Sequence, residues 1–127
     1  MSDATIRGPI AIVDDDGSVR RALSRLLQTH GIETLEHPSG REFLDSPTLH
    51  EVECVLLDIH MPGMSGLDVL EEIRVAATKL PVILMTGRYE EDFARRSLDA
   101  GASAFLRKPF EEVDLLRAID VAIRERR

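Results

Sequence analysis

The pattern of apolar and polar segments predicts an α/β fold, in which helices cover both faces of a parallel sheet. Three observations support this prediction: short apolar runs that suit buried strands, helical spacing of apolar residues between them, and regular alternation of the two. A length of 127 residues fits one domain whose core needs no disulfides, so we expect a single domain over residues 1–127.

The N-terminal part predicts a buried strand followed by a helix. Pro9–Val13 is a continuous apolar run, which is typical of a strand buried on both faces. Apolar residues then recur at helical spacing from Val19 to Leu27. We expect Asp16 to start this helix and Gly31 to occupy its C′ position.

A second strand and helix follow, and then a third strand. Ile32–Glu36 alternates between apolar and polar residues, which indicates a more exposed strand. Ser39 and Glu42 have the spacing of a capping box before the next helix. Cys54–Leu57 is a second apolar run and ends at Asp58, so we expect another buried strand there.

The remaining segments repeat the alternation of helix and strand. In chain order they are a helix that starts at Ser65-x-x-Asp68, a strand at Pro81–Met85, a helix at Glu90–Ala100 that Gly101 ends, a strand at Ala104–Leu106 and a helix from Val113 to Ile123. Strands and helices thus alternate five times. This order favours parallel pairing, because parallel strands need a crossover connection between them.

The composition excludes several classes of protein. A net charge of −7 opposes binding to nucleic-acid phosphate, and an aromatic content of 4% is low for a base-stacking surface. The single cysteine, Cys54, excludes a disulfide framework, and His30, His37 and His50 lack ligand spacing and are expected on the surface. Because no membrane-length apolar run or secretory signal is visible, we expect a cytoplasmic protein that binds neither nucleic acid nor membrane.

Polar residues stand at the ends of the predicted buried strands. Asp14 and Asp15 follow the first, Asp58 the third, Thr86 the fourth and Lys108 the fifth. The carboxyl ends of strands form the site crevice in an open α/β sheet, so we expect these side chains to converge. Three close carboxylates repel one another, and a divalent cation among them relieves this repulsion. Because the ligands are hard oxygens without paired His or Cys, the favoured cation is Mg²⁺. One carboxylate can then attack a phosphoryl donor, while Thr86 and Lys108 hold the other phosphoryl oxygens.

These residues and their neighbours resemble the motifs of the receiver domain of two-component response regulators. The matching segments are Val13-Asp14-Asp15, Asp58-x-x-Met61-Pro62-x-Met64-x-Gly66, Thr86-Gly87 and Lys108-Pro109-Phe110. The resemblance covers about residues 9–123, which is the core that we expect. It implies a flavodoxin-like (βα)5 fold with strand order 2-1-3-4-5, and transfer of a phosphoryl group from a histidine kinase to an aspartate.

The resemblance also implies a role for each acidic residue of the expected site. Asp58 matches the phosphoacceptor, Asp15 a direct Mg²⁺ ligand, and Asp14 an acidic neighbour that binds the metal through water. His60 matches a position that offers its backbone carbonyl to the metal, so its imidazole is not a ligand candidate. The implied cofactor is therefore Mg²⁺, held mainly by carboxylate oxygens.

A second group of matching residues implies a switch. Thr86 matches the switch hydroxyl, Lys108 the ammonium that pairs with the phosphate, and Phe105 the aromatic switch position. Lys108–Pro109 matches the cis peptide bond of the family. After phosphorylation, Thr86 moves toward the phosphate and Phe105 fills the vacated space. The face of the fourth helix, fifth strand and fifth helix then binds a partner or a second copy of the chain.

Several alternatives stay open at this point. Thr86 also fits a strand-end hydroxyl bonded to backbone, and Phe105 fits ordinary core packing. A phosphatase of the haloacid dehalogenase type needs a second Asp where His60 stands. A flavin- or nucleotide-binding module needs a phosphate loop where three aspartates follow the first strand. The receiver hypothesis implies a switch and no enzyme beyond self-phosphotransfer and autodephosphorylation.

The expected partner upstream is a cognate histidine kinase or a phosphotransfer protein. Thr86-Gly87 and Lys108-Pro109-Phe110-Glu111 look most like the FixJ-type branch, whose members often add a DNA-binding domain. The chain fits a stand-alone receiver as well as the receiver part of a longer regulator, and homodimerisation on phosphorylation is one expected output.

Overall fold

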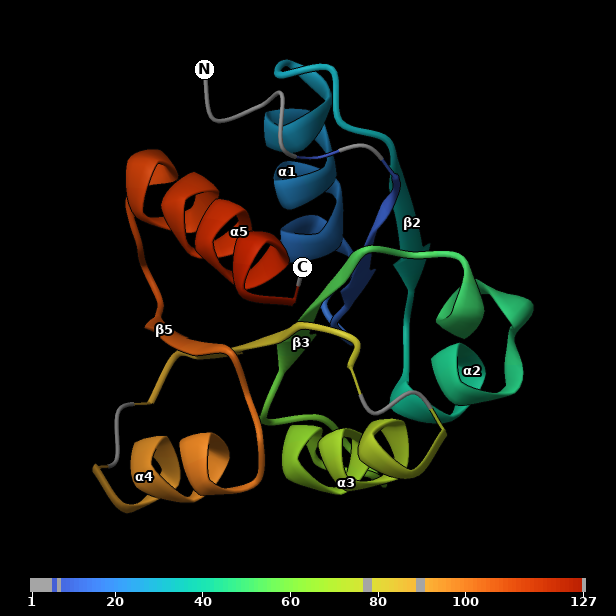
Figure 1. Cartoon of the computed structure of the whole chain (residues 1–127), viewed down its shortest axis with the longest axis vertical. Coiled ribbons are helices and arrows are strands. Elements are labelled where there is room, and N and C mark those ends of the chain that lie inside the picture. The colour runs from blue at the N-terminus through green and yellow to red at the C-terminus, as the bar shows by residue number, and fades with distance from the viewer. Residues whose placement is uncertain (1–5, 7, 77–78, 89–90, 127) are drawn as a thin grey trace.

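A five-stranded parallel sheet in the order β2-β1-β3-β4-β5 forms the centre of the molecule (Figure 1). The computed structural model describes residues 6, 8–76, 79–88 and 91–126. The strands are β1 (Ile10–Val13), β2 (Thr34–His37), β3 (Cys54–Asp58), β4 (Val82–Thr86) and β5 (Ala104–Arg107). The α/β class and the strand order 2-1-3-4-5 are therefore confirmed.

Helices cover both faces of this sheet, as the alternation of the sequence predicted. Along the described chain they are α1 (Gly17–Gln28), α2 (Gly40–Asp45), the short 3-10 helix η2 (Pro47–His50), α3 (Gly66–Ala76), α4 (Glu91–Asp99) and α5 (Glu112–Arg126). Helices α1 and α5 lie on one face, and α2, α3 and α4 lie on the other (Figure 1). In the part of the chain that the structure describes, no helix is long and apolar enough to cross a membrane.

Alternation along the strands divides the core into two layers. Ile12 and Leu56 point toward α1 and α5, whereas Val13 and Leu57 point toward the layer that contains α2 and α3. Strands β1, β3 and β4 are buried at every position. This two-sided burial explains why their sequences are continuous apolar runs, and it fixes the direction in which each strand end points.

Side-chain caps set where several helices begin. The Asp16 carboxylate accepts hydrogen bonds from the N–H groups of Ser18 and Val19 at the start of α1. Ser65 and Asp68 bond each other's backbone N–H groups across the first turn of α3, as a capping box does. These caps were predicted from spacing, and they fix the first turns of two helices that follow site residues.

The end of α1 also follows the prediction. The N–H of Gly31 bonds to the carbonyl of Gln28, and the N–H of Ile32 bonds to the carbonyl of Leu27. Gly31 has a φ of 75°, a conformation that favours glycine.

Local structure differs from the expectations at several points. Strand β2 begins at Thr34 and not at Ile32, and η2 was not predicted, because an edge strand and a short turn carry weak patterns. His37 was expected on the surface, but it is only 7% exposed. Its Nδ1 bonds to Glu42 Oε1, so the Glu42 carboxylate pairs with His37 and does not form the expected capping box. Of that box, only the Ser39 side chain caps α2.

The two C-terminal helices differ from expectation in detail. Val113 is 58% exposed, and the neighbouring Leu115 is the residue that packs into the core of this turn of α5. Helix α4 is described from Glu91, because the predicted first residue, Glu90, lies outside the described residues. The predicted end of α4 is confirmed, since Gly101 follows it with a φ of 100°.

Candidate functional site

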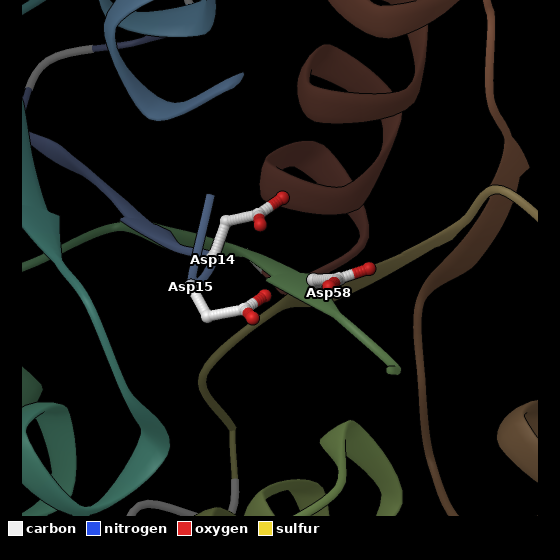
Figure 2. A group of neighbouring side chains, drawn as sticks. All are labelled: Asp14, Asp15 and Asp58. Atoms are coloured by element: carbon white, nitrogen blue, oxygen red, sulfur yellow. The ribbon is translucent and has the colours of Figure 1, made fainter. Parts of the chain in front are cut away.

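Three carboxylates meet at the carboxyl ends of β1 and β3. Asp14 and Asp15 follow β1, and Asp58 is the last residue of β3 (Figure 2). One carboxylate oxygen from each residue lies within 4.8 Å of the other two. Asp14 and Asp58 are buried, whereas Asp15 is exposed to solvent. The convergence that the sequence predicted is therefore present, and it opens to solvent on the side of Asp15.

Lys108 places a positive charge next to this carboxylate group. Its Nζ lies 2.9 Å from Asp14 Oδ2 and 3.4 Å from Asp58 Oδ1. It follows β5, and its backbone N–H bonds to the carbonyl of Thr86. The predicted cis peptide bond between Lys108 and Pro109 is present. The ammonium group thus bridges two of the three carboxylates.

Burial is the largest single influence on the pKa of Asp58 and of Lys108, the two central groups. Burial raises the pKa of the Asp58 carboxyl, the charge of Asp14 raises it further, and Lys108 lowers it. Burial alone lowers the pKa of Lys108, but its hydrogen bond to Asp14 and the charge of Asp58 raise it by more. Lys108 therefore stays protonated, while the ionised form of Asp58 is held in an unfavourable environment.

The arrangement fits a magnesium ion by the chemistry of its donors. The three carboxylates offer hard oxygen atoms, and the site includes neither a cysteine nor a paired histidine. A divalent cation there would offset the repulsion that raises the pKa of Asp58. The Asp15 side, which faces solvent, leaves room for water or phosphate oxygens around such an ion.

Thr86 lies at the edge of the site and bonds to its own loop. It is completely buried at the end of β4. Its Oγ1 donates to the carbonyl of Arg88 over 2.8 Å and accepts from the N–H of Arg88 over 3.0 Å. In this state the hydroxyl fixes the first turn of the loop between β4 and α4. Arg88 itself is exposed at the mouth of this loop.

His60 and Phe105 flank the site on the side of α4. The ring of His60 packs edge-on against Phe93 of α4, with centroids 5.7 Å apart, and its buried Nε2 has no hydrogen-bond partner in the structure. Phe105 is half-buried and packs against the core layer beneath α2, α3 and α4. The site loop after β3 and the aromatic residue of β5 therefore both border α4.

The loop after β3 folds back tightly onto the site. The N–H of Gly66 bonds to the carbonyl of Ile59 over 2.8 Å. A Cβ atom at Gly66 would lie 2.6 Å from the carbonyl oxygen of Asp58. Only glycine permits this approach, which explains the Gly66 of the loop motif and holds the backbone beside Asp58 in one path.

Arg20 also belongs to the surroundings of the site, and the sequence analysis missed it. Its guanidinium donates to the backbone carbonyl of Asp14 over 2.6 Å. A cation at the fourth residue of a helix whose first turn holds no acidic residue opposes the helix dipole. That unfavourable placement was the available sign that Arg20 has another role.

The chain matches a family model described as the response regulator receiver domain over residues 10–120. Transcriptional regulatory protein FixJ of Azorhizobium caulinodans is 34% identical over 115 residues, which are 91% of this chain and 54% of that protein. The chain spans about half the length of the curated relatives that it first matches. The similarity therefore concerns the receiver portion of these regulators.

Solved structures resemble the chain over nearly its whole length. A response regulator receiver domain protein from Clostridium thermocellum superposes with a TM-score of 0.85 at 32% identity, and the match covers 94% of this chain and 96% of that chain. The CheX-CheY-BeF3-Mg+2 complex from Borrelia burgdorferi contains a chain that matches with a TM-score of 0.83 at 25% identity, covering 94% of this chain and 91% of that one.

Proposed function

The chain belongs to the family of response regulator receiver domains, and on that premise we propose that Asp58 is the residue that accepts the phosphoryl group. The observation that supports this assignment is the meeting of Asp14, Asp15 and Asp58 with Lys108 at one edge of the sheet. Lys108 lies 3.4 Å from Asp58 Oδ1, and the charges of Asp14 and Asp15 both raise the pKa of Asp58. We treat residues 1–127 as one such domain, with its core at about 9–123.

The proposed reaction is transfer of a phosphoryl group from a phosphohistidine of a histidine kinase or phosphotransfer protein. A carboxylate oxygen of Asp58 forms a bond to phosphorus while the bond from phosphorus to the donor imidazole nitrogen breaks. The electron pair of the broken bond stays on the imidazole. Lys108 lies 3.4 Å from Asp58 Oδ1 and is placed to pair with a phosphoryl oxygen. Hydrolysis of the acyl phosphate, in which water takes up the phosphoryl group as inorganic phosphate and the Asp58 carboxylate is released, would return the domain to its resting state.

The residues that would hold Mg²⁺ are Asp15 and Asp58 directly, Asp14 through water, and the backbone carbonyl of His60. When bound, the ion neutralises charge on the carboxylates and on the phosphoryl oxygens. The exposed Asp15 gives a solvent-side ligand, and the buried Asp14 is already paired with Lys108 over 2.9 Å. This difference in pairing supports a direct role for Asp15 and an indirect one for Asp14.

Thr86 and Phe105 are the residues that we assign to the switch. In the resting state the Thr86 hydroxyl is engaged with the backbone of Arg88. A phosphoryl group on Asp58 offers it stronger acceptors, so the hydroxyl would leave Arg88 and free the β4–α4 loop. Phe105 lines a surface pocket of about 510 Å³ with Phe110 and Val121, so its movement would reshape the face formed by α4, β5 and α5.

That face is the proposed output surface, either for a partner or for a second copy of the chain. The relative from Azorhizobium caulinodans is described as a transcriptional regulatory protein, so regulation of transcription is the output that we propose for a longer protein containing this domain. The domain acts as a regulator, without direct contact to nucleic acid or membrane, and we propose the cytoplasm as its compartment.

The assignment of Asp58 is tested with acetyl phosphate as the phosphoryl donor. The parent protein is expected to gain one phosphate in the presence of Mg²⁺, measured as intact mass over time, and to gain none with a chelator present. Asp58→Asn should stay unmodified, while the control Asp99→Asn, which removes an exposed carboxylate of α4, should match the parent. Modification of Asp58→Asn at the parental rate would exclude Asp58 as the acceptor.

A further inference from the structure

Arg20 reaches from α1 to the carboxyl end of β1, where the acidic residues lie. Its Nη1 donates to the carbonyl oxygen of Asp14 over 2.6 Å, and its Nε lies 3.5 Å from Glu36 Oε1 on β2. The side chain is only 18% exposed, so most of it is shielded from water. One guanidinium thus connects α1, β1 and β2 beside the three carboxylates.

The contact is made to the backbone of Asp14 and leaves its carboxylate to other partners. The Asp14 carboxylate accepts from the N–H of Asp16 over 3.0 Å and from Lys108 over 2.9 Å. The carbonyl that Arg20 holds belongs to the peptide plane that joins Asp14 to Asp15. Because a peptide unit is planar, holding this carbonyl also holds the N and Cα atoms of Asp15, the atoms from which its side chain extends.

We propose that Arg20 is a positioning residue that presents Asp15 to Mg²⁺. This inference rests on the proposed function, in which Asp15 is a direct ligand of the ion. Asp15 is the exposed member of the carboxylate group, so its orientation depends on its backbone more than on surrounding side chains. Residues that orient metal ligands typically change metal affinity by about 10- to 100-fold when they are removed.

Charge and position are separable in this arrangement. Arg20 and Glu36 form an ion pair, so the two side chains together add no net charge next to the carboxylates. Arg20→Ala removes both the contact and one positive charge. The double variant Arg20→Ala with Glu36→Gln removes the contact but restores the parental net charge. Arg21→Ala, at the neighbouring exposed position, changes the charge in the same way without touching Asp14.

In the experiment, the whole chain is titrated with MgCl₂ and binding is measured by calorimetry. Thermal unfolding of the metal-free proteins is measured as well. Arg20→Ala and the double variant are expected to bind Mg²⁺ about tenfold more weakly than the parent, and Arg21→Ala to bind like the parent. Arg20→Lys, which keeps the charge but lacks the forked group needed for both contacts, should also bind more weakly. It serves as the second variant if Arg20→Ala does not fold.

The outcomes that overturn the inference differ from those that overturn the proposed function. A purely structural role of Arg20 would lower the melting temperature and leave the Mg²⁺ dissociation constant of the folded protein unchanged. Recovery of parental affinity in the double variant would assign the effect to charge and not to position. Failure of the parent itself to bind Mg²⁺ would instead remove the metal assignment on which this inference depends.

Discussion

Asp58 combines two requirements that oppose each other. The nucleophilic role that we propose for Asp58 requires an ionised carboxylate, yet burial and the charge of Asp14 raise its pKa. Lys108 offsets this effect only in part, because it also pairs with Asp14 over 2.9 Å. The metal-free site therefore stores unfavourable electrostatic energy at one residue, and this energy is available for binding a cation.

The first prediction is that Asp58→Asn stabilises the metal-free protein at neutral pH. A carboxyl group whose pKa is raised by folding favours the folded state only while it is protonated, and this contribution is lost as the pH rises through the raised pKa. The advantage of the variant should therefore be present at pH 7 and shrink on acidification toward the ordinary pKa of 3.8. Urea unfolding at several pH values measures it, and an advantage that grows at low pH would contradict this account.

At the scale of elements, two loops at the carboxyl ends of the strands carry the site. The loop from β3 to α3 is held by the approach of Gly66 to the backbone of Asp58, and the loop from β4 to α4 by the hydroxyl of Thr86. The first loop has no space for a side chain at position 66. The second depends on hydrogen bonds that a new acceptor can replace.

The second prediction is that Gly66→Ala lowers the free energy of unfolding by about 1–3 kcal/mol, the range for overpacking. A Cβ atom at position 66 would lie 2.6 Å from the Asp58 carbonyl oxygen, and backbone atoms must move to accept it. Gly87→Ala is the control, because nothing lies within 4 Å of a Cβ atom there. Chemical denaturation compares the two, and equal stability of Gly66→Ala and Gly87→Ala would show that the close approach is relaxed in solution.

The third prediction is that Thr86→Ala accepts phosphate but loses the response of the face formed by α4, β5 and α5. The variant keeps Asp58, Lys108 and the proposed metal ligands, while it lacks the hydroxyl that we propose to move toward the phosphoryl group. Amide chemical shifts in α4 and β5 should change on phosphorylation of the parent and change much less in the variant at equal occupancy.

The control for this variant is Ser97→Ala, which also removes a buried hydroxyl that donates to a backbone carbonyl. Ser97 Oγ bonds to the carbonyl of Phe93 within α4, so its loss affects the helix without touching the β4–α4 loop. It should respond to phosphorylation like the parent. A parental response in Thr86→Ala would leave Thr86 as a strand-end hydroxyl only.

For the whole molecule, the sequence pattern predicted a parallel sheet between helices because the core is divided so regularly, whereas the strand order 2-1-3-4-5 was implied by the resemblance to receiver domains. β1, β3 and β4 are buried on both faces, and such strands are visible as apolar runs. The site could be predicted from the same feature, since parallel strands bring Asp14, Asp58 and Thr86 to one edge. Because the strands are parallel, the residues that end or follow them in the sequence lie at the same edge of the sheet, where the site is.

Contacts between side chains of different elements were harder to predict from the sequence. The burial of His37 depends on its pairing with Glu42 and on its edge contact with Phe43, which no local pattern encodes. The contact of Arg20 with Asp14 depends on the rotation of α1 about its axis, which the packing of Leu23 and Leu27 determines. Sequence therefore located the residues of the site but not the partners that orient them.

The fourth prediction concerns the stability of the whole domain. A ligand that binds only the folded state stabilises it by about 2.7 kcal/mol when its concentration is a hundredfold above the dissociation constant. MgCl₂ at such an excess should raise the melting temperature of the parent and have little effect on Asp15→Asn. Asp16→Asn is the control, because asparagine also caps helices and the charge change is the same. An equal shift in all three proteins would place the cation elsewhere.

In the proposed function one residue, Asp58, carries the phosphoryl group. Borohydride reduces an aspartyl phosphate to homoserine, so treatment after reaction with acetyl phosphate and Mg²⁺, followed by peptide mass spectrometry, locates the modified residue. We expect homoserine at position 58, with Asp14 and Asp15 unchanged. Homoserine at position 14 or 15, or a phosphorylated protein with Asp58 intact, would contradict it.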